Sequence, residues 1–460
     1  MSKLKAQGSK LLDVTGFEVF RYGFGGFGVN LMYIMVSSYI IYYLTDIAGV
    51  SVAAAATMFL TSRIVDALFD PVIGAMSDRT KSKWGRYRPY MIFGSLFAIM
   101  IFIMLFTVVN FDTTGKNVYY FVMYSVWSIG YTLIVLPYQS IVSIVAKDKQ
   151  KRNYMVMASK LMSIPAGLVA ANIFKIVDAL GGGAGGWQKL AIIMSAMIVP
   201  SMWICASSAR RFDTKAASET AMLKSDGKKY SGKEQLKAVT SNKALLMLII
   251  AFATNNLASA SIKAVQSYFA KYVLQDMSFI ATVGNLSMIF GLVAFVAIPF
   301  AAKKFAKKDL FIVGTIIHVV YPIGLLFLDP VQNIGLITNL AIVSAIGGGI
   351  CNITAFMMLP DCVDFGKKMA GLKSAGLVTS GFTFSLKASA AIGGTLAGYA
   401  LAAVGFEAGA VQPKLVLTVI VLCMAVPAIA SDIASYIAMK KYPIDERKDD
   451  LTGDSMTTVA

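Results

Sequence analysis

Three ionisable residues, Arg63, Asp66 and Asp70, lie within one apolar stretch of the chain. Spacings of three and four residues place their side chains on the same face of a helix. An ionised side chain inside a membrane-spanning helix is costly, so it usually faces the bundle interior and serves a function. Two neighbouring carboxylates can bind Na⁺, a hard cation that prefers oxygen ligands, or can share a proton. The alternative is a structural ion pair with Arg63, or a polar contact that joins helices.

Two lysines, Lys160 and Lys387, are further isolated charges in apolar surroundings. A lysine in the middle of a spanning helix needs an anionic partner, and Asp66 and Asp70 are the candidates. Lys160 can instead extend its ammonium group to the membrane surface. For Lys387, which is flanked by phenylalanine and alanine residues, that arrangement is harder to build.

One apolar stretch also carries a regular face, because Trp127, Tyr131, Val135 and Gln139 recur every four residues. Aromatic rings on such a face can stack on the apolar face of a sugar, and an amide can bind its hydroxyl groups. Packing of the rings against neighbouring helices is an equally good interpretation.

The elements that must position these residues are helices in a membrane. Of the 460 residues, 57% are hydrophobic and 15% are charged, with a mean hydropathy of +0.67. Soluble domains carry about 25% charged residues, whereas a helix that crosses about 30 Å of hydrocarbon needs about 20 apolar residues. We therefore expect an all-α membrane protein with twelve transmembrane helices in two six-helix halves. The apolar segments lie near 17–45, 50–77, 89–110, 117–146, 154–177, 187–206, 244–270, 277–301, 310–328, 334–359, 375–404 and 415–439.

The net charge of +17 is concentrated in particular loops. Loops after even-numbered segments carry most of the lysine and arginine, and loops after odd-numbered segments carry few. Because positive residues stay on the cytoplasmic side, we predict that the even loops and both termini are cytoplasmic, in a bacterial-type cell (inner) membrane. The charge indicates a lipid bilayer as partner and no nucleic acid.

The polar stretches predict the domain organisation. Residues 1–209 form an N-terminal half, 210–243 a cytoplasmic connector, 244–440 a C-terminal half and 441–460 a cytoplasmic tail. The sequence contains a single histidine, His318, and shows no catalytic triad, metal-ligand cluster or phosphate-binding motif. We therefore expect no enzyme and no cofactor apart from a coupling cation.

Several motifs follow one another along the chain. They are GGFG at 25–28, RIVDALFDPVIG at 63–74, WGRYRP at 84–89, Tyr131-Thr132, PDCVDFG at 360–366 and FSLK at 384–387. This set resembles the glycoside–pentoside–hexuronide:cation symporter family, which has the major facilitator fold. The resemblance spans nearly the whole chain.

The resemblance implies roles for individual residues. The cation site would consist of Asp66, Asp70 and Thr132, with both aspartates as metal ligands if the cation is Na⁺. The residues implied beside it or in the sugar pocket are Lys387, Lys160, Trp127 and Tyr131.

Three positions differ from melibiose-type members of that family. Asn30 and Val135 stand where those members have acidic residues that hold galactosyl hydroxyls, and Gln139 stands where they have a tryptophan. Fewer acids beside Lys160 and Lys387 favour a sugar acid or its glycoside, bound through a lysine–carboxylate contact. A neutral pentoside that uses Asn30 and Gln139 is the alternative.

The resemblance also implies alternating access, for which a monomer is sufficient. We predict a cytoplasmic charge network that holds the outward-facing state, formed by Asp78, Arg79, Arg86, Arg88, Asp361 and Asp364. Coupling to Na⁺ or to H⁺ stays open. Three alternative functions also stay open: an H⁺-coupled carrier of a neutral pentoside or oligosaccharide, a lysolipid flippase on the same fold, and a non-transporting sensor.

Overall fold

The computed structural model describes residues 14–146, 149–214, 242–302, 304–370 and 375–444. These residues form helices connected by short loops, with no strand among them. Most of the predicted connector 210–243 and of the predicted tail 441–460 lies outside the described residues. The chain divides into two compact units, unit 1 from Met1 to Gly227 and unit 2 from Lys228 to Ala460.

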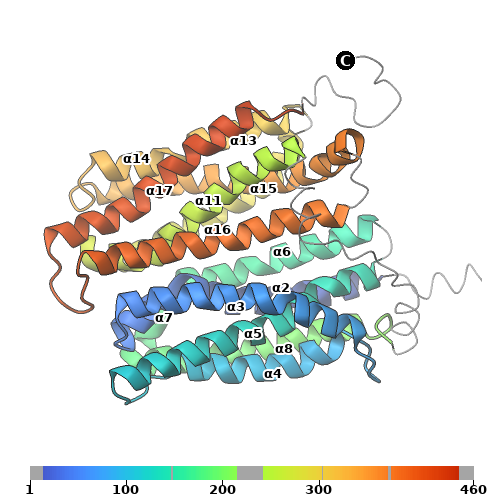
Figure 1. Ribbon diagram of the computed structural model, residues 1–460, viewed down its shortest axis with the longest axis horizontal. Helices are drawn as coiled ribbons and strands as arrows, with labels where there is room; N and C mark the ends of the chain where they lie inside the picture. Colours follow the sequence, from blue (N-terminus) through green and yellow to red (C-terminus); the bar gives the residue numbers. More distant parts are fainter. Residues whose placement is uncertain (1–13, 147–148, 215–241, 303, 371–374, 445–460) are drawn as a thin grey trace, which may run out of the picture. The chain divides into compact units, whose positions relative to one another are not determined.

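Unit 1 is a bundle of long helices (Figure 1). Its elements are α2 (Gly16–Tyr42) with the π-helical turn η1 (Tyr43–Ile47), α3 (Val52–Arg79), α4 (Arg88–Leu105), α5 (Thr113–Val145), α6 (Lys149–Ala171), α7 (Ile173–Ala179) and α8 (Gly183–Ser208).

Unit 2 is a second bundle of the same kind. Its elements are α11 (Lys243–Tyr268) with the π-helical turn η2 (Phe269–Val273), α12 (Ser278–Ala301), α13 (Lys307–His318), α14 (Val320–Phe327), α15 (Ile334–Ala370), α16 (Ala375–Ala403) and α17 (Lys414–Lys440).

Each of the twelve predicted apolar segments coincides with one helix or with two consecutive helices, so the predicted all-α membrane fold is confirmed. Within the described residues, 11 helical spans are long and apolar enough to cross a membrane. The remaining predicted segment, 375–404, is α16, a helix of 29 residues. Its many glycine, alanine and serine residues make α16 less apolar than its neighbours.

The two units repeat one packing pattern. In unit 1, α2 packs on α6 and α8, and α5 packs on α3 and α4. In unit 2, α11 packs on α16 and α17 in the same way, and α15 packs on α12 and α13. The first long helix of each unit also ends in a five-residue π-helical turn. Such internal repetition is typical of secondary transporters.

Glycines allow α2 to approach two other helices closely. A Cβ atom at Gly26 would lie 2.5 Å from the Ser159 carbonyl oxygen of α6, and one at Gly28 would lie 2.0 Å from Ser201 Oγ of α8. Small residues at such crossings are the usual means by which membrane helices pack without a hydrophobic driving force. The α2 helix therefore packs closely against both α6 and α8.

Candidate functional site

The two aspartates of α3 face α5, where two hydroxyl groups meet them. Asp66 is only 8% exposed. Its Oδ1 accepts a hydrogen bond from Ser128 Oγ and lies 3.4 Å from Thr132 Oγ1. Thr132 Oγ1 lies equally far, 3.4 Å, from Asp70 Oδ1. Since a hydroxyl has one proton to donate, Thr132 can satisfy one carboxylate at a time, and its oxygen lies between the two.

Arg63 contributes a positive charge to this cluster. Its Nη1 lies 3.3 Å from Asp66 Oδ2, so the predicted ion pair exists alongside the carboxylate cluster. The guanidinium also lies over the rings of Phe59 and Tyr33, at 5.1 and 5.9 Å. The side chains of Arg63, Asp66 and Asp70 themselves carry one positive and two negative charges when all are ionised.

An aromatic stack adjoins the cluster on α5. Tyr131 stacks on Trp127 with ring centroids 5.5 Å apart and on Tyr33 of α2 at 5.7 Å. Trp127 is fully buried, and its indole N–H has no hydrogen-bond partner among the described residues. Tyr131 is half-buried. Of the two predicted aromatic contacts, only Tyr131 therefore offers part of its surface, with Trp127 packed behind it.

The other residues predicted to bind substrate are more scattered. Asn30 is half-buried, and its amide donates to the Gly26 carbonyl one turn earlier on α2, at 2.7 Å. Gln139 on α5 and Lys160 on α6 are exposed in unit 1. Lys387 is exposed on α16, in unit 2. The structure thus brings Asp66, Asp70 and Thr132 together, with Tyr131 next to Thr132 on α5. The binding roles of all these residues stay predictions.

Ser128 is a member of the cluster that the sequence analysis missed. Besides Asp66, its hydroxyl lies 3.1 Å from the backbone carbonyl of Ser62 on α3. The signal was available, because Ser128 precedes Thr132 by four residues, the same spacing that separates Asp66 from Asp70. Two helices that each carry polar residues at this spacing can match them in register.

The loop between α3 and α4 is organised differently from the predicted charge network. Asp78 accepts a hydrogen bond from the Tyr87 phenol, rather than pairing with an arginine of the described residues. Burial of the phenol, and then this hydrogen bond, raise the pKa of Tyr87 above its ordinary value. Arg79 is exposed. The side chain of Arg88 donates to the carbonyls of Ala206 and Trp84, at 3.1 and 3.3 Å.

The carboxylate that binds this loop is Asp213, which follows α8 and is only 2% exposed. It accepts hydrogen bonds from the backbone N–H groups of Arg86 and Tyr87 at 2.9 Å and of Arg88 at 3.0 Å. These N–H groups mark the start of α4, where a helix favours an anion. Gly85 permits the approach, since its φ is +92° and a Cβ there would lie 2.2 Å from the Asp213 carbonyl oxygen.

Replacement of Asp213 by asparagine is expected to destabilise unit 1 by at least about 2 kcal/mol, because hydrogen bonds to a charged group contribute about 1.5–3 kcal/mol each. The amide nitrogen of asparagine would also face backbone donors. Thermal unfolding of the purified protein in detergent would show a lower midpoint than wild type. Lys81→Ala, an exposed change in the same loop, is the control. Equal midpoints for Asp213→Asn and Lys81→Ala would contradict this role of the carboxylate.

In unit 2, the predicted network residue Asp361 pairs with Lys307, with Nζ and Oδ2 2.6 Å apart. This contact joins α15 to the start of α13. Asp364 is exposed on the next turn of α15. The two units therefore use different contacts at these loops, a buried carboxylate on backbone amides in unit 1 and a lysine–aspartate pair in unit 2.

Comparison with known proteins identifies the family of this chain and supports its fold. The family described as MFS/sugar transport protein matches residues 21–446. The isoprimeverose transporter of Lactiplantibacillus pentosus is 29% identical over 442 residues, covering 95% of this chain and 90% of that protein. A putative glycoside/cation symporter of Escherichia coli (strain K12), YagG, is 25% identical over 448 residues, covering 95% and 94%. The solved structure of the nucleoside transporter NupG matches with a TM-score of 0.63 at 11% identity over 93% of this chain and 100% of that chain, which supports the fold.

Proposed function

Since this chain belongs to the MFS/sugar transport protein family, and is thus a multi-pass membrane transporter and not an enzyme, we propose that it is a sugar–cation symporter. In this proposal Na⁺ or H⁺ moves inward together with a sugar, a glycoside or a hexuronide. Its relatives include an isoprimeverose transporter and a putative glycoside/cation symporter, which supports a sugar as substrate and a cation as partner. We place it in a bacterial inner membrane with both termini cytoplasmic, acting as a monomer by alternating access.

The observation that carries the proposal is the charge of the cluster on α3. Asp66 and Asp70 outnumber Arg63 by one charge, and Thr132 and Ser128 direct oxygen atoms at the same place. Carboxylate and hydroxyl oxygens are suitable ligands for Na⁺, a hard cation, and a proton could equally be shared by the carboxylates. Either ion would offset the negative charge of the carboxylates in a segment where charge is costly.

The position of α5 suggests how cation and sugar are coupled. Ser128 and Thr132, which face the carboxylates, alternate along α5 with Trp127 and Tyr131, which form the aromatic stack. A cation that draws Asp66, Asp70 and Thr132 together would therefore fix the rotation of α5 and the plane of the Tyr131 ring. Because coupling between two ligands is reciprocal, a sugar on that ring would raise the affinity for the cation.

Polar groups near the stack bear on the class of sugar. Tyr131 offers a partly exposed ring, and Gln139 lies two turns further along the same helix. Lys160, exposed on α6, could bind the carboxylate of a sugar acid through a charge-assisted contact. Lys387 remains a predicted contact from the family resemblance. We therefore propose a hexuronide or its glycoside first, and a neutral glycoside second.

Uptake of a radiolabelled glycoside panel, with glucuronides and xylosides, tests the proposal in cells that express the chain. We expect concentrative uptake of at least one sugar that is lost without the ion gradient. Uptake that needs a Na⁺ gradient would identify Na⁺ as the coupling cation, and uptake abolished only by a protonophore would identify H⁺. Competition by neutral glycosides but not by glucuronides would rule out the anionic substrate. No uptake of any sugar would contradict the proposal and favour a lipid substrate.

A further inference from the structure

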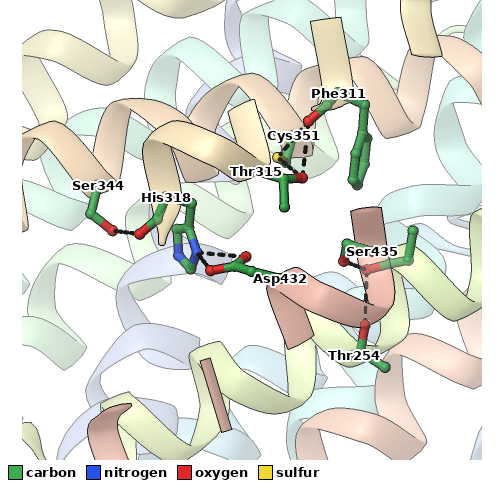
Figure 2. A network of polar contacts seen from close by, with 9 residues as sticks. Thr254, Phe311, Thr315, His318, Ser344, Cys351, Asp432 and Ser435 are labelled. Atoms are coloured by element: carbon green, nitrogen blue, oxygen red, sulfur yellow. Dashed lines mark hydrogen bonds and ion pairs between the residues drawn. The ribbon is translucent and has the colours of Figure 1, made fainter. Parts of the chain in front are cut away.

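A buried acid–base pair in unit 2 takes no part in the cation cluster of unit 1. His318 lies at the end of α13 and Asp432 lies on α17, with side chains that are 12% and 3% exposed. His318 Nδ1 lies 3.0 Å from both carboxylate oxygens, and Figure 2 shows the ring directed at the carboxylate. Neither residue has a second ionic partner in the part of the chain that the structure describes.

The pair lies where a membrane-spanning segment lacks one of its backbone hydrogen bonds. The span Lys307–Phe327 is 21 residues long, and it is divided near its middle, where α13 ends at His318 and α14 begins at Val320. In a continuous helix the N–H of residue 322 would bond to the carbonyl of residue 318, but Pro322 has no N–H. Ser344 Oγ on α15 donates to the His318 carbonyl instead, at 2.6 Å. The backbone stays helical at Val319, whose N–H bonds to the Thr315 carbonyl and whose own carbonyl accepts a bond from the Ile323 N–H.

Other titratable groups surround the pair without adding charge beside it. Cys351 on α15 donates to the Phe311 carbonyl at 3.5 Å and lies 3.6 Å from Thr315 Oγ1, one turn before His318. It is drawn with the pair in Figure 2. The remaining titratable residues on α13, α14, α15 and α17 are Lys307, Lys308, Asp309, Tyr321, Asp361, Asp364, Lys367, Lys368, Lys414, Cys362, Cys423, Tyr436 and Lys440. Only Asp432 makes an ionic contact with His318 within the described residues.

The net charge of this pair depends on one proton. A carboxylate next to an imidazolium, or a carboxylic acid bonded to a neutral imidazole, carries no net charge. Removing the proton leaves one negative charge in an apolar interior, where an unpaired ion has a large desolvation cost. Imidazole is also the side chain whose ordinary titration range covers physiological pH. The geometry is thus that of a group which binds and releases a proton.

We propose that His318 and Asp432 form a proton-binding site in unit 2, separate from the cation site at Asp66 and Asp70, through which pH acts on transport. The effect on transport rests on the proposed function, whereas the binding of the proton does not. The proton is held between Nδ1 of His318 and the Asp432 carboxylate. Its loss changes the electrostatic contact between α13 and α17 at the point where the span lacks a backbone hydrogen bond.

The first test uses the fact that the chain has one histidine. Full-length protein labelled with ¹⁵N-histidine, purified without a polyhistidine tag into nanodiscs, gives imidazole resonances from His318 alone. We expect these resonances to change between pH 5 and 9. In Asp432→Asn the change should occur at a different pH from wild type, because the carboxylate next to the ring is gone. The control is Asp329→Asn, at an exposed loop carboxylate that bonds to backbone N–H groups. In this variant the resonances should change at the same pH as in wild type.

The single variant can fail to fold, because removing one partner of a buried pair is strongly destabilising. The double variant His318→Asn with Asp432→Asn is designed for that case, since two amides can bond to each other without charge. It is assayed for exchange of labelled against unlabelled sugar from pH 5.5 to 8.5, together with wild type and Asp66→Asn. We expect a severalfold pH dependence of exchange to persist in Asp66→Asn and to be lost in the double variant.

Each outcome decides the proposal. Resonances that do not change between pH 5 and 9, or that change at the same pH in wild type and Asp432→Asn, would overturn the proton site even if sugar uptake is established. A wild-type pH profile in a folded double variant would overturn its effect on transport. Resonances that titrate as expected in a protein that transports no sugar would support the proton site and contradict the proposed function instead.

Discussion

Replacement of Asp66 by asparagine is expected to abolish accumulation of sugar against its gradient. A transporter that moves one positive charge with each sugar gains about 2.3 kcal/mol per 100 mV of membrane potential, which corresponds to about a 50-fold accumulation at that potential. Asparagine at this position removes one of the two carboxylates proposed to bind the cation, so cation binding should be lost. The inside concentration should then do no more than equal the outside concentration. Uptake into proteoliposomes with an imposed potential and ion gradient measures the ratio.

Exchange experiments separate this effect from misfolding. Counterflow of labelled against unlabelled sugar needs no net cation movement, so a folded Asp66→Asn protein should retain it at reduced rate. Asp112→Asn is the matched control, because this carboxylate caps α5 at the Gly115 N–H and asparagine is an equally good cap. Accumulation at the wild-type ratio in Asp66→Asn would remove Asp66 from the cation site.

The helices could be predicted from the sequence because hydrophobic runs report directly on membrane crossing. The residues at which the helices end could not be predicted in this way. The prediction ended one segment at residue 359, but α15 continues through Pro360 to Ala370, since a helix can extend into water where hydropathy gives no signal. The division of the span at His318 was also missed. Its cause, Pro322, is visible in the sequence, but whether a proline bends or interrupts a helix depends on neighbours such as Ser344.

In the candidate site, contacts within one helix could be predicted from the sequence, whereas most contacts between distant segments could not. The shared face of Asp66 and Asp70 follows from helix geometry, and the family resemblance added Thr132 from a second helix. Asp213 stands 126 residues from Tyr87, whose backbone N–H it binds, and no pattern in one sequence encodes that pairing. Ser128 stands 62 residues from Asp66, and only its spacing from Thr132 hinted at the contact. Asp432 did carry a signal, as a lone acid within an apolar 27-residue helix. Asp432 was not among the predicted site residues, and its partner His318 lies 114 residues earlier in the chain.

The crossing of α2 and α6 leads to the second large effect, a loss of folded protein in Gly26→Ala. The new Cβ would lie 2.5 Å from the Ser159 carbonyl oxygen and 2.7 Å from Ser159 Oγ, so the α6 backbone has to move. Overpacking of this kind costs about 1–3 kcal/mol and occasionally more. We expect a lower unfolding midpoint in detergent. Sugar uptake should also fall, because Asn30 bonds to the Gly26 carbonyl and Tyr138 of α5 bonds to Ser159.

A second glycine-to-alanine change is the control, because it is expected to leave the unfolding midpoint unchanged or to raise it. Gly74 on α3 has no atom within 4 Å of an added Cβ, and alanine favours a helix over glycine by about 1 kcal/mol. Gly74→Ala should therefore unfold at the same midpoint as wild type or a higher one. The higher helix propensity of alanine favours folding at both positions. Any decrease of the unfolding midpoint in Gly26→Ala therefore reports on the contact between α2 and α6. If both variants unfold at the same midpoint, that crossing tolerates a Cβ, and α2 is positioned by the remainder of its contacts.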